Sequence, residues 1–169
     1  GQGTKTRQLA AAFPNARIIA TDADESRVER LLARFTEEPR VRVLPLTVAR
    51  QEAWGKADLV LLDVPCSNTG VLARRPEAKH RFDAAHLTSL MNLQKQILAD
   101  TIPLLAESPR GKILYSTCSL EAQENGQQVV WADHWHRLGV SRERSDTPHG
   151  QPGGDSWGYS DGSFSAVLG

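Results

Sequence analysis

Short apolar runs alternate with amphipathic segments along most of this 169-residue chain. The apolar runs have the length of buried strands, and the amphipathic segments repeat their apolar side chains at helical spacing. We expect strands at residues 17–21, 41–44, 58–62, 112–117 and 163–168. We expect helices at residues 4–13, from Asp24 or Ser26 onward, at 84–106 and over most of 121–138. This alternation predicts βαβ units and a mostly parallel, doubly wound sheet in one domain, residues 1–169.

Two polar stretches interrupt the pattern. Residues 66–81 are expected to form a polar loop, and residues 145–160 are rich in Gly, Pro, Ser and Asp, which also predicts a loop. Pro103 is expected to kink or end the helix in which it falls. The buried face of that helix is expected to comprise Leu87, Leu90, Met91, Leu93, Ile97 and Leu98, and that of the helix after Asp24 to comprise Val28, Leu31, Leu32 and Phe35.

The overall charge of the chain is balanced, with 20 Lys and Arg against 20 Asp and Glu. A domain that binds nucleic acid by itself usually carries a basic excess, so affinity for RNA must come from a local patch or from a region outside this chain. No apolar stretch approaches the roughly 18 residues of a membrane span. Two cysteines do not make a disulfide framework, and we expect a reducing, cytoplasmic location.

The chain opens with Gly1 inside a glycine-containing loop that leads directly into a helical pattern. A strand normally precedes such a loop, so we expect a fragment that begins within its first βα turn. The loop Gly1–Thr6 would offer backbone N–H groups at a helix N-terminus, where anionic groups bind, and Lys5 adds a positive charge. A plain βα turn is the alternative.

Asp22 directly follows the strand expected at residues 17–21. An acidic side chain at this position commonly binds the ribose hydroxyls of an adenosine-containing ligand. The alternative is a helix N-cap, a role for which Asp24 and Glu25 compete. With the glycine loop before it, Asp22 favours a cofactor that contains a nucleoside.

Cys66 and Cys118, the only cysteines of the chain, each come just after an expected strand and are each followed by serine. The carboxyl ends of parallel strands form the edge at which α/β sheets bind ligands, so both thiols should reach the same edge. A single cysteine in such a place is more often a small buried side chain. The pair indicates thiolate chemistry on a bound substrate.

Other chemistries are less well supported. Two thiolates and scattered histidines fall short of a zinc site, so we expect no metal. A dense basic cluster follows the Cys66 loop and suits the positioning of phosphate groups, with a solvated loop as the alternative. This basic cluster comprises Arg74, Arg75, Lys79, His80 and Arg81.

Taken together, these segments resemble the motifs of one family. Asp63–Gly70 with Arg74–Pro76, and Tyr115–Leu120 with Glu124–Asn125, are similar to the paired cysteine motifs of the RsmB-like (Sun/Nol) family of RNA cytosine-carbon-5 methyltransferases. Asp161–Phe164 resembles that family's closing strand. The resemblance runs over nearly the whole chain and implies a Rossmann-like class I methyltransferase domain, with the first strand and an N-terminal RNA-binding region lying outside this sequence.

The resemblance also implies a cofactor and roles for individual residues. The cofactor would be S-adenosylmethionine, bound by Gly3, Lys5, Asp22, Asp63 and Pro65. Cys118 would be the nucleophile that attacks the target cytosine, Cys66 would help to release the product, and Asp63 would contact the cytosine ring. RNA, in particular ribosomal RNA, would be held by Arg74, Arg75 and Lys79.

The chain departs from the family pattern near the cofactor. Thr4 stands where a second glycine is expected, and the stretch between Val43 and Trp54 lacks the aspartate expected near the adenine. These differences favour one alternative, a non-catalytic RNA-binding or scaffold domain. A second alternative is a related methyltransferase with Cys66 as nucleophile, because the Pro65–Cys66 pair resembles DNA cytosine-5 methyltransferases.

Overall fold

A computed structural model describes residues 3–107, 109–150, 155 and 158–169. Gly1 and Gln2 of the expected opening loop lie outside the described residues, as does part of the expected 145–160 loop. The chain divides into two compact units, Gly1–Trp54 and Gly55–Gly169. Each unit is an α/β arrangement in its own right.

The first unit contains α1 (Thr4–Ala12), β1 (Ile18–Ala20), α2 (Glu25–Arg34), β2 (Val41–Val43) and α3 (Leu46–Ala53). β1 and β2 pair in parallel, with Ile18 opposite Val41. The helix α2 buries Val28 and Leu31, whereas Leu32 is 49% exposed, contrary to expectation. Successive helical positions are turned by about 100°, so Leu32 lies beside the buried stripe rather than on it.

Two local features fix the helix starts of this unit. Gly3 has φ +76°, and a Cβ on it would lie 2.7 Å from the ring of Phe35, so glycine is required before α1. Asp24 caps α2 by accepting a hydrogen bond of 2.9 Å from the Ser26 N–H. The cap is therefore Asp24, which leaves Asp22 outside that role.

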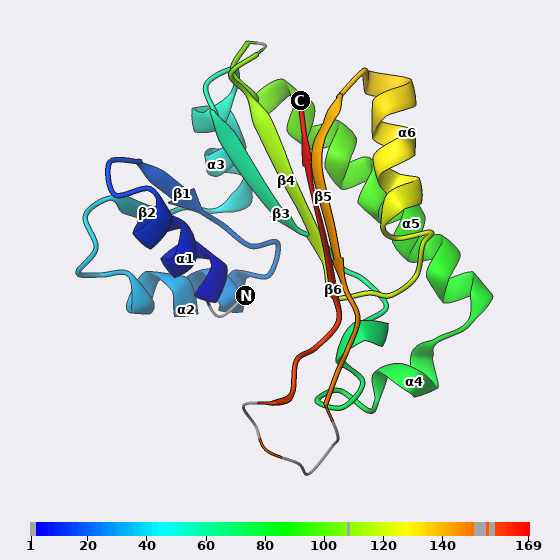
Figure 1. Ribbon diagram of the computed structural model, residues 1–169. Coiled ribbons are helices and arrows are strands. Elements are labelled where there is room, and N and C mark those ends of the chain that lie inside the picture. Colours follow the sequence, from blue (N-terminus) through cyan, green and yellow to red (C-terminus); the bar gives the residue numbers. More distant parts are fainter. Residues whose placement is uncertain (1–2, 108, 151–154, 156–157) are drawn as a thin grey trace. The chain divides into compact units, whose positions relative to one another are not determined.

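The second unit is built on a sheet with the strand order β3-β4-β6-β5 (Figure 1). The strands β3 and β4 are parallel, and β6 runs antiparallel to both β4 and β5. Its elements are β3 (Leu59–Asp63), η1 (Thr69–Val71), α4 (Ala78–Arg81), α5 (Ala84–Thr101), η2 (Ile102–Leu104), β4 (Lys112–Thr117), α6 (Gly126–His136), β5 (Val140–Asp146) and β6 (Ser163–Leu168).

The core of the second unit lies between this sheet and the helices α5 and α6, which pack against each other on one face of it (Figure 1). Ile113 and Tyr115 of β4 are fully buried, as is Leu98 of α5. Along α5 the buried positions are Leu90, Gln94, Leu98 and Thr101. Leu93 was expected on this face but is 45% exposed, because the buried stripe of α5 is narrower than the set of apolar residues along the helix.

Two α-helices and one strand were not expected from the sequence. The helices α3 and α4 fall where no apolar period is visible, and α4 lies inside the expected polar loop of residues 66–81. The strand β5 is almost entirely exposed and carries Arg, Glu and Ser side chains, so it has no buried alternation to detect. Charged edge strands of this kind resist pairing with other chains. The long helix ends at Thr101, and Pro103 lies in the short 3₁₀ turn that follows it.

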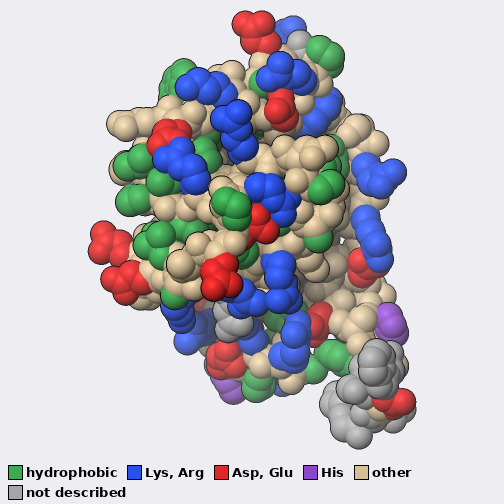
Figure 2. Space-filling view, turned by 90° about the vertical axis from the view of Figure 1, so that its left-hand side faces the viewer, with side chains coloured by type: hydrophobic (Ala, Val, Ile, Leu, Met, Phe, Trp, Pro, Cys, Tyr) green, Lys and Arg blue, Asp and Glu red, His purple; other side chains and the backbone are tan. Residues whose placement is uncertain are grey.

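The surface of the folded chain carries mixed charge, as its equal numbers of basic and acidic residues predict. On the face shown in Figure 2, Lys and Arg side chains lie scattered among Asp and Glu side chains rather than in one continuous band. In the described part of the chain, no helix combines the length and apolar character that crossing a membrane requires.

Candidate active site

The two cysteines meet at one edge of the second unit's sheet. β3 and β4 are adjacent and parallel, with Asp63 opposite Ser116, so the segments after them leave the sheet together. The Sγ atoms of Cys66 and Cys118 lie 3.2 Å apart, and both residues are free thiols. Cys66 is buried and Cys118 is half-buried. A substrate at this edge would therefore encounter Cys118 more readily than Cys66.

Asn68 holds the sulfur pair from the side. Its amide nitrogen donates to the Cys66 carbonyl at 2.8 Å, which turns its Oδ1 toward Cys118, whose Sγ donates to it at 3.1 Å. The Cys118 N–H in turn donates to Cys66 Sγ at 3.4 Å. Asn68 adopts φ 62°, a left-handed conformation that asparagine tolerates better than most residues. The backbone is therefore bent to place this amide between the two cysteines.

The surroundings of the sulfur pair favour the protonated form of Cys66. The adjacent Cys118 sulfur and then burial raise the pKa of the Cys66 thiol, and the N–H groups of Asn68 and Cys118 offset only part of that effect. Two sulfurs in contact cannot both carry a negative charge at low cost. Cys66 consequently keeps its proton in this pair.

Gly70 joins the two cysteine motifs to the closing strand. Its N–H donates to the Cys118 carbonyl at 2.9 Å, and its own carbonyl accepts from the Gly162 N–H at 2.8 Å. A Cβ on Gly70 would lie 2.6 Å from the Gly162 carbonyl oxygen and 2.8 Å from that of Cys118. The backbone approaches so closely here that only glycine fits.

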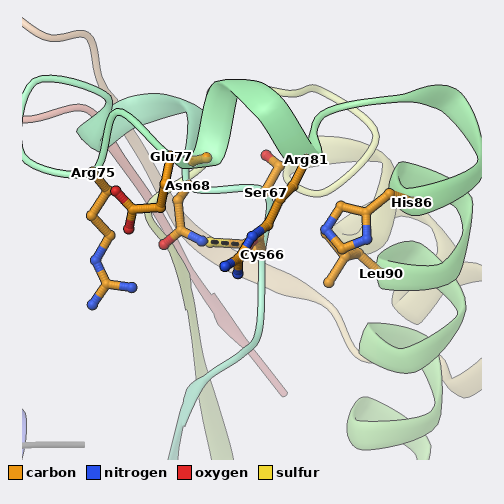
Figure 3. Close-up of a pocket in the computed structure, with 9 residues that line it drawn as sticks. Cys66, Ser67, Asn68, Arg75, Glu77, Arg81, His86 and Leu90 are labelled. Carbon is orange, nitrogen blue, oxygen red and sulfur yellow. Dashed lines mark hydrogen bonds between the residues drawn. The ribbon is translucent and has the colours of Figure 1, made fainter.

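A pocket of about 210 Å³ opens beside Cys66 (Figure 3). The side chains of Arg81 and His86 reach toward Cys66 from α4 and α5, and Arg75 lies on the opposite side. Glu77 is the acidic residue in the lining. Cys66 belongs to the pocket lining and Cys118 does not, so the pocket places cationic and imidazole groups next to the Cys66 thiol.

The structure separates the expected RNA-binding residues. Arg75 lines the pocket, whereas Arg74 forms an ion pair with Asp161, the residue before Gly162. Lys79 is an exposed residue of α4 outside the pocket lining. Arg81 belonged to the basic cluster without an assigned role, and both Arg81 and His86 line the pocket beside Cys66.

Asp63 and Pro65 lie at the same edge of the second unit as the cysteines. Asp63 is the last residue of β3 and is exposed. Pro65 is exposed too, and its carbonyl accepts a hydrogen bond of 2.8 Å from Gln94 Nε2. Gln94 was missed in the sequence, although a glutamine on the apolar face of an expected helix is a recognisable sign of a buried polar contact.

The expected cofactor residues of the first unit lie at the ends of its secondary structure elements. Gly3 is the N-cap residue of α1 and offers no side-chain cap, so N–H groups of the first turn of α1 suit an anionic group. Asp22 follows β1, accepts the Asp24 N–H at 3.1 Å and lies 3.7 Å from the Arg27 guanidinium. An uncapped helix start and a carboxylate after a strand fit the carboxylate and ribose ends of S-adenosylmethionine. In the described residues no group of three or more His, Cys, Asp or Glu side chains could hold a metal ion.

Solved structures define the class of the fold. NSun6 from Pyrococcus horikoshii with SFG matches with a TM-score of 0.78 at 22% identity, over 98% of this chain and 44% of that chain. A methyltransferase homolog protein from Pyrococcus horikoshii matches with a TM-score of 0.70 at 24% identity, over 98% of this chain and 57% of that chain. The chain therefore has the Rossmann-like fold of methyltransferases, as expected.

Sequence comparison then identifies the family. Residues 1–145 match the family described as 16S rRNA methyltransferase RsmB/F, so this chain belongs to that family. Ribosomal RNA small subunit methyltransferase B of Pasteurella multocida (strain Pm70) is 35% identical over 136 residues, which cover 75% of this chain. The chain spans 30% of the length of that relative. The family indicated by the cysteine motifs is thus confirmed.

Proposed function

We propose that this chain is the catalytic domain of an RNA methyltransferase that modifies carbon 5 of a cytosine in ribosomal RNA through a covalent cysteine adduct. The observation that carries the proposal is the contact between Cys66 and Cys118, 3.2 Å apart at the carboxyl edge of two parallel strands. Family membership and relatives named for ribosomal RNA methylation support the substrate class.

The chemistry explains why a thiol pair suits this reaction. Carbon 5 of cytosine is a poor nucleophile because it belongs to an aromatic ring. Addition of the Cys118 thiolate to carbon 6 breaks the aromaticity and makes carbon 5 electron-rich. The Asp63 carboxyl group would hydrogen-bond ring nitrogen 3 and stabilise charge that develops on the ring.

Cys66 is suited to the second half of the reaction. After methylation, the carbon 5 proton leaves and the bond between Cys118 and carbon 6 breaks. The Cys66 thiol lies beside Cys118 and retains its proton, because the neighbouring sulfur and burial raise its pKa. It can therefore donate its proton to the departing Cys118 sulfur, and the Cys66 thiolate formed in this way can accept the carbon 5 proton, which leaves two thiols and 5-methylcytosine.

S-adenosylmethionine would supply the methyl group. Gly3 and Lys5 would bind its methionine end, Asp22 its ribose, and Asp63 and Pro65 its reactive end. SFG, a S-adenosylmethionine analogue, is named in the structure of NSun6 from Pyrococcus horikoshii, which shares this fold. Arg75 and Arg81 would hold the RNA backbone beside the thiols, since guanidinium groups pair well with phosphate.

Transfer of a labelled methyl group tests this function. The protein is incubated with ribosomal RNA and S-adenosylmethionine, and the digested nucleosides are separated by mass spectrometry. We expect label in 5-methylcytidine and a fall of at least about 10³-fold in the Cys118→Ala variant. Label in another nucleoside would contradict the assignment. Calorimetry that shows no heat of S-adenosylmethionine binding, together with retained RNA binding, would favour the scaffold alternative.

A further inference from the structure

Glu124 is a carboxylate with no solvent exposure, and it lies behind the cysteine pair. Its Oε1 and Oε2 accept the Ser67 N–H at 3.0 and 3.2 Å, and Oε2 also accepts the Ser67 hydroxyl at 2.5 Å. The Ser119 hydroxyl donates to Oε2 at 2.6 Å. One carboxylate thus binds the residue that follows Cys66 and the residue that follows Cys118.

Glu124 is itself held in place by two other elements. Gln94 Nε2 of α5 donates to Oε1 at 2.9 Å and to the Pro65 carbonyl at 2.8 Å, so it bridges the carboxylate and the Cys66 loop. The Tyr115 hydroxyl of β4 donates to the Glu124 backbone carbonyl at 2.7 Å. The carboxylate is therefore fixed relative to the strand that leads into Cys118.

Burying a carboxylate is unfavourable unless hydrogen-bond donors surround it. These donors come from both cysteine loops, so moving either loop would leave the buried carboxylate short of partners. The cost of such movement disfavours any separation of the loops. The hydrogen bonds at Glu124 therefore restrain the distance between the two sulfurs.

We propose that Glu124 is a positioning residue that locks the Cys66 and Cys118 loops together and so keeps the two thiols in contact. Its bearing on catalysis rests on the proposed function, but its effect on the thiol pair does not. Glu124 belongs to a segment quoted for the family resemblance, yet it touches neither sulfur. It acts through Ser67 and Ser119.

The equilibrium between the thiol pair and glutathione measures this effect directly. The chain has two cysteines, so any intramolecular disulfide joins Cys66 to Cys118. In the exchange, the protein dithiol and one oxidised glutathione give the protein disulfide and two reduced glutathione molecules. The equilibrium constant is the effective concentration of one thiol near the other, which rises as the loops are held together.

Glu124→Ala is expected to lower this effective concentration about tenfold or more, the loss expected for hydrogen bonds to a charged group. Gln128→Ala is the matched control, because Gln128 is equally buried but donates to the Gln123 carbonyl instead. It should leave the value unchanged. A wild-type effective concentration in Glu124→Ala, or an equal decrease in both variants, would overturn the proposal.

Two further variants guard against loss of folding. The double variant Ser67→Ala, Ser119→Ala keeps Glu124 but removes both hydroxyl donors, and its effective concentration should fall as well. Glu124→Gln keeps an oxygen for the Ser67 N–H and should recover most of the wild-type value. A double variant equal to wild type, or a Gln variant no better than Ala, would overturn the proposal.

Methyl transfer on the same variants separates this proposal from the proposed function. With Glu124 as a positioning residue, kcat falls in Glu124→Ala in step with the effective concentration, while KM for RNA stays close to wild type. A wild-type protein without methyl transfer would refute the proposed function and leave the thiol equilibrium to decide the role of Glu124. Normal kcat with a lowered effective concentration would overturn the catalytic part of the Glu124 proposal.

Discussion

The backbone N–H of Gly70 donates a hydrogen bond of 2.9 Å to the carbonyl of Cys118. This bond ties the loop after one cysteine to the backbone of the other. The carbonyl of Gly70 accepts from the N–H of Gly162, the residue before β6, so segments far apart in the sequence meet at one residue.

Gly70→Ala should disrupt this meeting point. The added Cβ would lie 2.6 Å from the Gly162 carbonyl oxygen, which cannot move without shifting β6. We expect a loss of about 1–3 kcal/mol in the free energy of unfolding, measured by urea denaturation. Gly139→Ala is the control, because its Cβ would meet nothing within 4 Å. Equal stability of the two variants would contradict the close packing at Gly70.

The raised pKa of Cys66 can be tested by alkylation. The Cys118 sulfur is the largest cause of that raised pKa, and burial is the second. In the Cys118→Ala variant, the pKa of the Cys66 thiol should fall toward the ordinary thiol value of about 8.5. Iodoacetamide labelling of Cys66, followed by peptide mass spectrometry, should then proceed at lower pH than in the wild type. An unchanged pH profile would mean that burial alone controls the thiol.

Tyr115 should make the protein sensitive to alkali. Burial, followed by the charge of Glu124, raises the pKa of this phenol. Above the unfolded-state value of about 10, the unfolded chain loses a proton that the native state keeps, so stability falls as pH rises. Urea denaturation between pH 9 and 11 (about one unit on each side of that value) should show a smaller decline in Tyr115→Phe. Parallel declines would contradict the assignment.

The pocket beside Cys66 predicts unequal roles for the arginines. Arg81→Ala should weaken RNA binding and lower the slope of log K against log salt by about 0.7, the value for one phosphate contact with a single strand. Arg74→Ala should change this slope less, because Arg74 already pairs with Asp161. Arg110, which pairs with Asp58, supplies a charge-matched control. Equal slopes for Arg81→Ala and Arg110→Ala would place the RNA elsewhere.

The sequence predicted those parts of the fold that bury apolar residues in a regular pattern. The strand at 112–117 was expected at its observed bounds because it starts with an apolar run, and β6 because its apolar residues alternate; both strands bury every second residue. The strand β5 was missed because its side chains remain in solvent, so pairing with β6 rather than hydrophobic burial determines its conformation.

The candidate site was predictable in part, for a similar reason. Cys66 and Cys118 could be placed at one edge because parallel strands present their carboxyl ends together. The distance between their sulfur atoms could not be predicted, since it depends on Asn68 and on hydrogen bonds to Glu124 that link residues distant in sequence. The separate role of Arg74 also depends on a tertiary contact, its ion pair with Asp161.

The most direct test of the account is a covalent protein–RNA complex on a denaturing gel. With S-adenosylmethionine and ribosomal RNA, Cys66→Ala should accumulate this complex, because the thiol expected to help release the product is absent. Cys118→Ala and the double variant should form none. A complex that persists in Cys118→Ala and disappears in Cys66→Ala would contradict the assignment of Cys118 as the nucleophile.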